Sequence, residues 1–192
     1  NHSSGKMGFA IAESLANEGA EVTLVTGPTH QVLSNPGIKL IKVTAAQEMY
    51  EACATLFATQ DITVLSAAVA DYKPLVQADQ KIKKKEGGLT IELTQTIDIA
   101  ATLGKQKKNK QLLIGFALET EQEKSNALKK LESKNFDMIV LNSLNDKGAG
   151  FGHDTNKITI INRKQEEQHF DLKDKKAVAN DIVKAISQLL HA

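Results

Sequence analysis

A short apolar run in the middle of the chain, from Ile62 to Leu65, limits the folds that this sequence can adopt. Its length and its β-branched residues are typical of a strand that is buried on both faces, as in a parallel sheet. The run ends in three small residues, Ser66, Ala67 and Ala68, which allow a ligand to lie close to the backbone. Because open parallel sheets bind ligands at the carboxyl ends of their strands, this stretch predicts both a central strand and a site beside it.

Strands and helices are expected to alternate along the rest of the chain. Apolar or alternating runs predict strands at 21–26, 38–43, 62–65, 89–93, 112–117, 138–141, 157–162 and 168–172. Helical periodicity predicts helices over about 7–18, 44–57, 96–104, 120–134 and 175–190. This order predicts a doubly wound, Rossmann-like α/β fold with a mostly parallel sheet and an antiparallel hairpin at one edge. We expect a single domain over residues 1–192.

The chain begins with a helix, whereas a fold of this kind begins with a strand. The segment from Asn1 to Gly5 has the character of a loop that leads from a strand into a helix. We therefore expect the first strand to lie upstream of Asn1. The helix that follows should end at Gly19, which occupies a capping position.

Charge and composition argue against two classes of function. The net charge is only +1 and aromatic residues make up 4% of the chain, with no Trp, so a general nucleic-acid surface with stacking platforms is disfavoured. No apolar run is long enough to span a membrane. The single cysteine, Cys53, cannot form an internal disulfide, which favours a reducing, cytoplasmic setting.

Several charged residues suggest a polyphosphate ligand, although each also has an ordinary structural explanation. Asp71 and Lys81 follow the central strand, where a carboxylate can bind a sugar hydroxyl, a base or Mg²⁺ and an ammonium group can neutralise phosphates. Lys130 and Lys134 share one helix face and repel each other unless an anion lies between them. Phe116 could flank a base, but a lone Phe usually fills a core. The five histidines have no metal-binding spacing.

The helix start at Ser3–Lys6 could also hold an anion. Its spacing is not that of a Walker loop. The helix and strand over 5–26 are compatible with a short-chain dehydrogenase, but the strand ends in Thr26-Gly27-Pro28, without an acidic residue for a ribose hydroxyl. Neither Tyr50 nor Tyr72 is followed four residues later by the Lys that such an enzyme requires.

Taken together, six segments resemble the phosphopantothenate–cysteine ligase family, the synthetase domain of the bifunctional coenzyme A biosynthesis flavoprotein. They are Asn1-His-Ser-Ser-Gly-Lys-Met-Gly8, Ala67-Ala-Val-Ala-Asp-Tyr72, Lys81-Ile-Lys-Lys84, Gly115-Phe-Ala-x-Glu-Thr120, Lys134-Asn-x-Asp137 and Gly150-Phe-Gly-x-Asp-x-Asn156. The resemblance covers nearly the whole chain, in the order of the family.

The resemblance implies a two-step reaction in coenzyme A biosynthesis. The carboxylate of 4′-phosphopantothenate attacks the α-phosphate of CTP and releases pyrophosphate, and the cysteine amine then displaces CMP from the acyl-cytidylate. It further implies Mg²⁺ and a homodimer with small-molecule substrates. A phosphopantothenoylcysteine decarboxylase could be fused upstream of Asn1 or exist separately, and FMN is expected only if it is fused.

By the same resemblance, Lys81 serves the first half-reaction and Asn1 orients the acyl group for the second. The nucleotide would contact Ala67, Ala68, Asp71, Lys81, Ile97, Asp98, Ile99, Ala100, Phe116, Lys130 and Lys134. The metal ligands are not identified. The run Gln95-Thr-Ile-Asp-Ile99 lacks the family's proline at Ile97 and its cation at Gln95, which leaves the choice between CTP and ATP open.

Two other classes of function remain as alternatives. One is a short-chain-dehydrogenase-like NAD(P) oxidoreductase, and the other is a nucleotide-binding module without catalysis. NADPH oxidation would indicate the first, and CTP binding without turnover would indicate the second.

Overall fold

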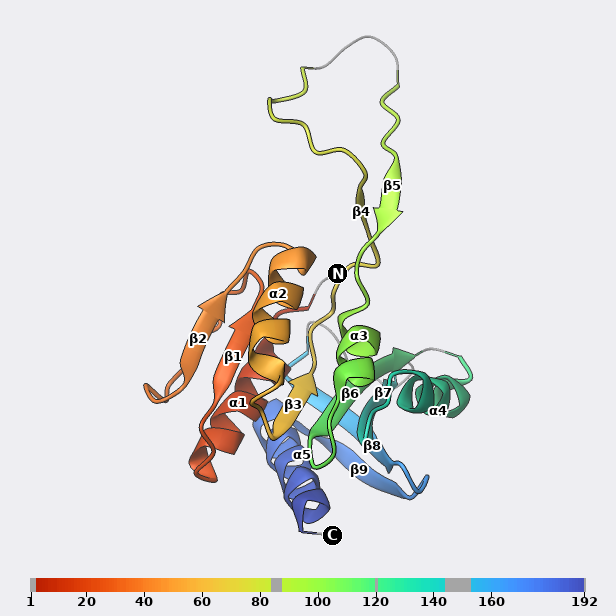
Figure 1. The fold of residues 1–192 in the computed structure, drawn as a ribbon. Coiled ribbons are helices and arrows are strands. Elements are labelled where there is room, and N and C mark those ends of the chain that lie inside the picture. The colour runs from red at the N-terminus through yellow and green to blue at the C-terminus, as the bar shows by residue number, and fades with distance from the viewer. Residues whose placement is uncertain (1–2, 84–87, 120, 144–152, 192) are drawn as a thin grey trace.

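The computed structural model describes residues 3–83, 88–119, 121–143 and 153–191. Figure 1 shows a layered body from which a narrow two-stranded arm projects. The helices are α1 (Lys6–Asn17), α2 (Ala46–Phe57), α3 (Ile99–Gln106), α4 (Glu123–Ser133) and α5 (Lys175–Leu190). The strands are β1 (Thr23–Thr26), β2 (Lys39–Lys42), β3 (Ile62–Leu65), β4 (Tyr72–Pro74), β5 (Leu93–Gln95), β6 (Leu112–Glu119), β7 (Met138–Ser143), β8 (Thr155–Asn162) and β9 (Glu167–Asp174).

The main sheet has five strands in the order β3-β6-β7-β8-β9. The first three are parallel, and β8 and β9 add antiparallel strands at one edge. This arrangement confirms the predicted mostly parallel α/β sheet with an edge hairpin. The parallel strands leave their carboxyl ends on one side of the sheet, which is where a ligand site is expected.

Strands β1 and β2 form a separate parallel pair beside the main sheet. Among the described residues, β3 pairs only with β6, so one edge of β3 has no strand partner. All four residues of β3 are consequently half-buried. The prediction that this strand is buried on both faces is therefore wrong in degree, because burial of a parallel strand also depends on neighbours along its edges.

Successive side chains along a strand point to opposite faces of the sheet. Alternate residues of each strand therefore contribute to two cores, one on each face. On one face Ile114 and Val140 pack against α1 and α5. On the other face Leu113 and Ile139 pack against α2, α3 and α4. The backbone at Gly115 approaches the second core so closely that an added Cβ would lie 2.1 Å from the Phe136 ring. The helices that pack on both faces of the sheet hold the ends of the strands in place.

Local signals place α1 correctly but misplace two other helix starts. Gly19 has φ +89° and ends α1, with its N–H bonded to Ala16 O and the next N–H bonded to Leu15 O, as in a Schellman cap. Helix α2 begins at Ala46, two residues after the expected start at 44, and the carboxylate of Glu48 in its first turn accepts from the Ala45 N–H at 3.2 Å.

The other differences concern α4 and the arm. Helix α4 begins at Glu123, after Gln122, which has φ +46° and no side-chain cap. Residue 120, where the helix was expected to begin, lies outside the described residues. The strand expected at 89–93 is instead Leu93–Gln95, paired antiparallel with Tyr72–Pro74, which was not predicted as a strand. In the described part of the chain, no helix is both long and apolar enough to cross a bilayer.

Candidate active site

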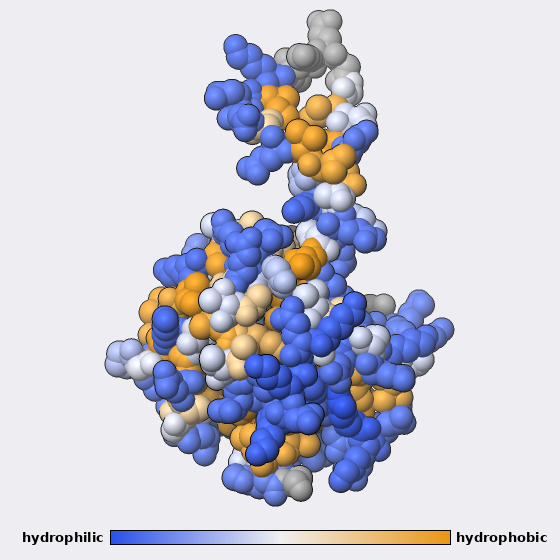
Figure 2. All heavy atoms as spheres, in the orientation of Figure 1, coloured by the Kyte–Doolittle hydropathy of each residue, from blue (hydrophilic) through white to orange (hydrophobic). Residues whose placement is uncertain are grey.

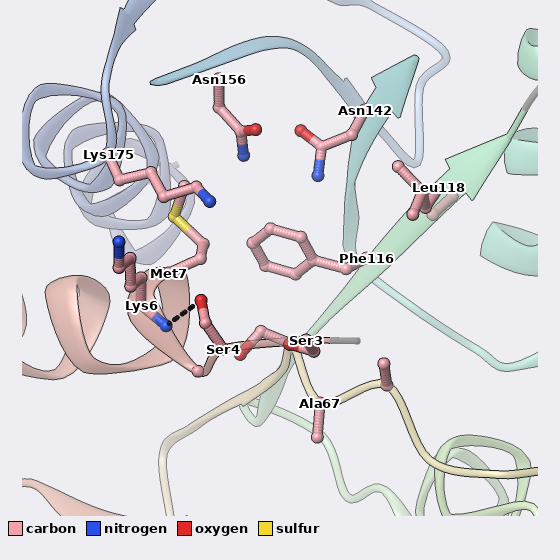
Figure 3. A pocket seen from close by; sticks show the side chains of 14 residues that line it. Ser3, Ser4, Lys6, Met7, Ala67, Phe116, Leu118, Asn142, Asn156 and Lys175 are labelled. Carbon is pink, nitrogen blue, oxygen red and sulfur yellow. Dashed lines mark hydrogen bonds between the residues drawn. The ribbon is translucent and has the colours of Figure 1, made fainter. Parts of the chain in front are cut away.

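A cavity of about 130 Å³ lies at the carboxyl ends of the parallel strands. It is bounded by the starts of α1 and α5 and by the ends of β3, β6 and β7 (Figure 3). The lining residues are Ser3, Ser4, Gly5, Lys6, Met7, Ser66, Ala67, Ala68, Phe116, Ala117, Leu118, Asn142, Asn156 and Lys175. Since complete ligand pockets usually enclose several hundred Å³, this cavity can enclose only part of a larger ligand.

The turn before α1 forms one wall of the cavity. Gly5 has φ +79°, a conformation that favours glycine, and the Thr29 hydroxyl donates to the Ser4 carbonyl at 2.7 Å. These features hold the first N–H groups of α1 toward the cavity, a position suited to an anion. Asn1 lies outside the described residues, so its expected role stays a prediction.

Small residues let the wall at α1 approach the wall at β3. A Cβ added to Gly8 would lie 3.0 Å from the Ser66 hydroxyl oxygen, which leaves little room for a larger side chain in α1. The predicted contacts Ala67 and Ala68 follow β3 and line the cavity, together with the predicted Phe116 of β6. Phe116 is half-buried and packs on the core beneath, so it is partly a core residue and partly a wall of the cavity.

Two buried amides, which the sequence did not single out as ligands, complete the opposite wall. Asn142 of β7 is 9% exposed and Asn156 of β8 is 3% exposed. Both side chains point into the cavity in Figure 3. The Asn142 Oδ1 atom is buried without a hydrogen-bond partner among the described residues. A buried orphan acceptor is costly, so Asn142 Oδ1 is a candidate acceptor for a donor group of a ligand.

A second group of predicted residues lies at the start of α3 and the end of α4. Asp98 caps α3, accepting from the Ala101 N–H at 2.9 Å, and it pairs with Lys134 at 3.2 Å. Burial opposes ionisation of Asp98, but the hydrogen bonds from Ala101 and Lys134 outweigh it and lower its pKa. The pair is close because Gly104 touches the chain at Lys134, where a Cβ would lie 2.1 Å from the Lys134 carbonyl oxygen.

The remaining predicted cation of α4, Lys130, is paired as well. Its ammonium group lies 2.6 Å from Glu119 Oε1 at the end of β6. Ile97, Ile99 and Ala100 pack on the core beside α3. Lys130 and Lys134 therefore both have carboxylate partners, which a polyphosphate would have to replace or join.

The structure does not bring Asp71 and Lys81 into the cavity. Asp71 is exposed at the base of the arm, where its carbonyl accepts from the Thr96 N–H at 2.8 Å. Lys81 is exposed farther along the arm, beyond β4. Among the described residues, no group of three or more His, Cys, Asp or Glu side chains could hold a metal ion. Burial raises the pKa of the Cys53 thiol, as expected for a structural cysteine.

Comparisons with known proteins place the chain among proteins of pantothenate metabolism. The model of the DNA/pantothenate metabolism flavoprotein C-terminal domain matches residues 1–190. The coenzyme A biosynthesis bifunctional protein CoaBC of Bacillus subtilis is 41% identical over 189 residues, covering 98% of this chain and 46% of the relative. A crystal structure of the C-terminal domain of CoaBC is 41% identical, with a TM-score of 0.81, and the match covers 98% of this chain and 84% of that one.

Another relative carries a different name. A "Cysteine/Cysteine sulfinic acid decarboxylase" from an unknown prokaryotic organism is 54% identical over 191 residues, covering 100% of this chain and 53% of the relative. The chain thus spans about half the length of the curated relatives that it matches.

Proposed function

The chain belongs to the family of DNA/pantothenate metabolism flavoprotein C-terminal domains, and from this we propose that it joins 4′-phosphopantothenate to cysteine at the expense of CTP. The observation that carries the proposal is the cavity itself. It gathers Ser3–Gly5, Ala67–Ala68 and Phe116 from three distant segments, and these are segments by which the chain resembles the ligase family.

The proposed chemistry needs positioning and charge neutralisation more than a strong acid or base. A carboxylate oxygen of 4′-phosphopantothenate attacks the α-phosphorus of CTP, and the bond to the leaving pyrophosphate breaks. The cysteine amine then attacks the acyl carbon, loses a proton and expels CMP. The first step brings an anionic carboxylate against the anionic triphosphate, and the second develops negative charge on the acyl oxygen and the departing CMP. Fixed cations and backbone N–H groups are therefore the natural catalysts.

We assign the nucleotide to the side of the sheet that carries α3 and α4. Ile97, Asp98, Ile99 and Ala100 supply the helix start. The ammonium groups of Lys130 and Lys134 can donate to the nucleotide phosphates. Asp71 offers a single exposed carboxylate, which fits a Mg²⁺ ion that the nucleotide phosphates would chiefly hold. Lys81 would serve the first half-reaction, and Asn1 would orient the acyl group in the second.

The first test is pyrophosphate release from CTP or ATP in the presence of Mg²⁺ and 4′-phosphopantothenate, with and without cysteine. We expect release that depends on CTP and 4′-phosphopantothenate. Release with ATP alone would retain the ligase and change the nucleotide. CTP binding without any release would favour a non-catalytic module, and NADPH oxidation would favour an oxidoreductase.

The decarboxylase name of one relative at 54% identity makes a second candidate function worth a direct test. CO₂ release from cysteine or cysteine sulfinic acid, without nucleotide, would support it. In the ligase proposal, a flavin-dependent decarboxylase is a fused or separate partner that consumes the product, and any FMN would belong to that partner. The cytoplasmic setting remains a prediction from the single cysteine.

Exposed apolar residues on the arm support the proposed homodimer. Seven of the eleven large apolar side chains that are exposed in the described residues lie on the arm, and Figure 2 shows orange surface there. They are Tyr72, Leu75, Val76, Ile82, Leu89, Ile91 and Leu93. Such a concentration of apolar surface is typical of an interface. The two arms, one from each copy, would cover each other.

Val76→Asp on the arm should therefore weaken dimerisation, because it would bury a charge in the interface. Light scattering over a concentration series would show a monomer fraction that grows on dilution. Val32 is 86% exposed outside the arm, so Val32→Asp is the matched control and should leave the mass unchanged. A monomeric wild-type protein would remove the homodimer from the proposal.

A further inference from the structure

The two lysines assigned to the nucleotide are held by carboxylates in unequal ways. Lys130 of α4 lies 2.6 Å from Glu119 at the end of β6, and the Glu119 side chain is only 14% exposed. Lys134, the residue after α4, lies 3.2 Å from Asp98 before α3, and the Asp98 side chain is 52% exposed. None of these four residues lines the cavity at the ends of the parallel strands.

The Glu119 carboxylate is held at both of its oxygens. Oε1 accepts from Lys130 Nζ, and Oε2 accepts from the Asn126 side-chain amide at 3.2 Å. The same amide nitrogen also donates to the Glu121 carbonyl at 3.1 Å, so both of its hydrogens have acceptors. Asn126 and Lys130 are one turn apart on α4, and one face of the helix therefore fixes the carboxylate.

The difference in exposure decides which lysine can change partners. Without the ammonium group, Glu119 would be a largely buried carboxylate whose remaining donor, Asn126, is neutral, and a buried charge that loses its partner is strongly destabilised. The exposed Asp98 carboxylate loses much less, because water can replace Lys134 and the backbone of α3 continues to donate to it. Exchange of the carboxylate for a phosphate is therefore far less costly for Lys134 than for Lys130.

We propose that Glu119 is a positioning residue that keeps Lys130 in place while the nucleotide is bound, whereas Asp98 gives up Lys134 to a phosphate. The inference rests on the proposed function, which assigns both lysines to the nucleotide. An ammonium group has three N–H donors. The contact with Glu119 uses one of them, so Lys130 can donate to a phosphate without leaving its carboxylate.

The sign of the effect of Glu119→Met distinguishes positioning from simple electrostatics. By charge alone, removing a carboxylate beside the site would strengthen the binding of a triphosphate. If Glu119 positions Lys130, its loss leaves a long side chain free, and the entropy lost when that side chain is ordered then opposes binding. Weaker binding therefore indicates that the positioning effect outweighs the repulsion.

The test is equilibrium binding of CTP in the presence of Mg²⁺, measured by calorimetry, which reports the affinity and the competent fraction of the protein without turnover. For Glu119→Met we expect CTP to bind about 10-fold more weakly, within the usual range for a charged hydrogen bond. Glu119→Gln keeps a neutral acceptor for Lys130 and should lose less. The double variant Glu119→Met/Lys130→Met should bind CTP no more weakly than Lys130→Met alone, since Glu119 acts through Lys130.

Asp98→Asn should have the opposite effect. Asparagine keeps the side-chain oxygen that caps α3, but it removes the charge that holds Lys134. We expect CTP to bind about two- to fivefold more tightly, which is the size of effect that an exposed ion pair usually has. Weaker binding by Asp98→Asn would overturn the exchange of Lys134.

Glu167→Met is the matched control, because Glu167 pairs with another lysine of α4, Lys124, which is not assigned to the nucleotide. It removes a carboxylate from the same helix and should leave the CTP affinity within about twofold. Unchanged or tighter binding by Glu119→Met would overturn the proposal. An additional loss in the double variant beyond that of Lys130→Met would also overturn it and indicate a structural role for Glu119.

The same measurement separates this inference from the proposed reaction. A wild-type protein that binds no CTP would refute the nucleotide assignment and this inference together. A protein that binds CTP and shows the expected changes, but releases no pyrophosphate with 4′-phosphopantothenate, would refute the ligase and retain the role of Glu119.

Discussion

Lys81→Gln is expected to reduce CTP-dependent pyrophosphate release by about 100-fold or more, the usual consequence of removing a group that stabilises charge in the transition state. Glutamine retains the length and polarity of the side chain but removes the ammonium charge. Lys81 is exposed on the arm, so the fold should tolerate the change. Initial rates at saturating CTP and 4′-phosphopantothenate measure the effect, and an unchanged melting temperature verifies the fold.

The same arm provides the control for this prediction. Lys83 lies two residues away and is also exposed, so Lys83→Gln removes the same charge from the same segment. We expect the Lys83 variant to retain most of the activity. Similar losses in both variants would indicate that the overall positive charge of the arm, rather than a specific contact of Lys81, promotes the reaction. Because Lys81 does not line the cavity, the proposed contact requires an arm, of the same copy or the second one, to lie over the site.

Much of the fold could be predicted because its signals are local. Helix α5 has the predicted bounds, and the hairpin of β8 and β9 lies where alternating residues indicated. The arm was harder because its pairing depends on two segments about twenty residues apart. The predicted strand at 89–93 had the right alternation, yet only Leu93–Gln95 finds partners in Tyr72–Pro74. Alternation reports which residues could face a core, whereas pairing depends on what lies beside them.

The residues of the candidate site could be predicted only where their own sequence segment marks them, for example by their place at the end of a recognisable strand. Ala67, Ala68 and Phe116 follow or lie within recognisable strands, and they meet at the cavity. Asn142 and Lys175 were not selected, because each is ordinary in its own segment, and Asn156 was noted only as the last residue of a family-like segment, without a role. A polar residue near the end of an apolar strand was the only hint of Asn142. Their importance arises from convergence of β7, β8 and α5 at one cavity, which no single segment reveals.

Asp137 illustrates the opposite case, a residue in a family-like segment that the structure places far from the cavity. It immediately precedes β7, at the amino end of the parallel strands. Its carboxylate accepts from the Leu113 N–H at 2.7 Å and from Lys107 Nζ at 2.7 Å, and Arg163 Nε lies 3.2 Å away. The side chain of Lys107 is 9% exposed and that of Asp137 is 16% exposed. This carboxylate thus ties β6, β7 and the segment after α3 together.

Asp137→Ala should lower the free energy of unfolding by about 3–5 kcal/mol, because it leaves the Leu113 N–H without its acceptor and the buried Lys107 ammonium without its carboxylate, with only the neutral Asn135 carbonyl to accept from it. That loss is a large part of the 5–15 kcal/mol that usually holds a domain together. Urea denaturation followed by circular dichroism measures it, and Asp171→Ala on the exposed face of β9 should change stability by less than about 0.5 kcal/mol. The double variant Lys107→Met/Asp137→Ala should be more stable than Asp137→Ala alone, since no buried charge remains unpaired. If the two substitutions add, the ion pair does not carry the stabilisation, and the backbone bond to Leu113 must account for it.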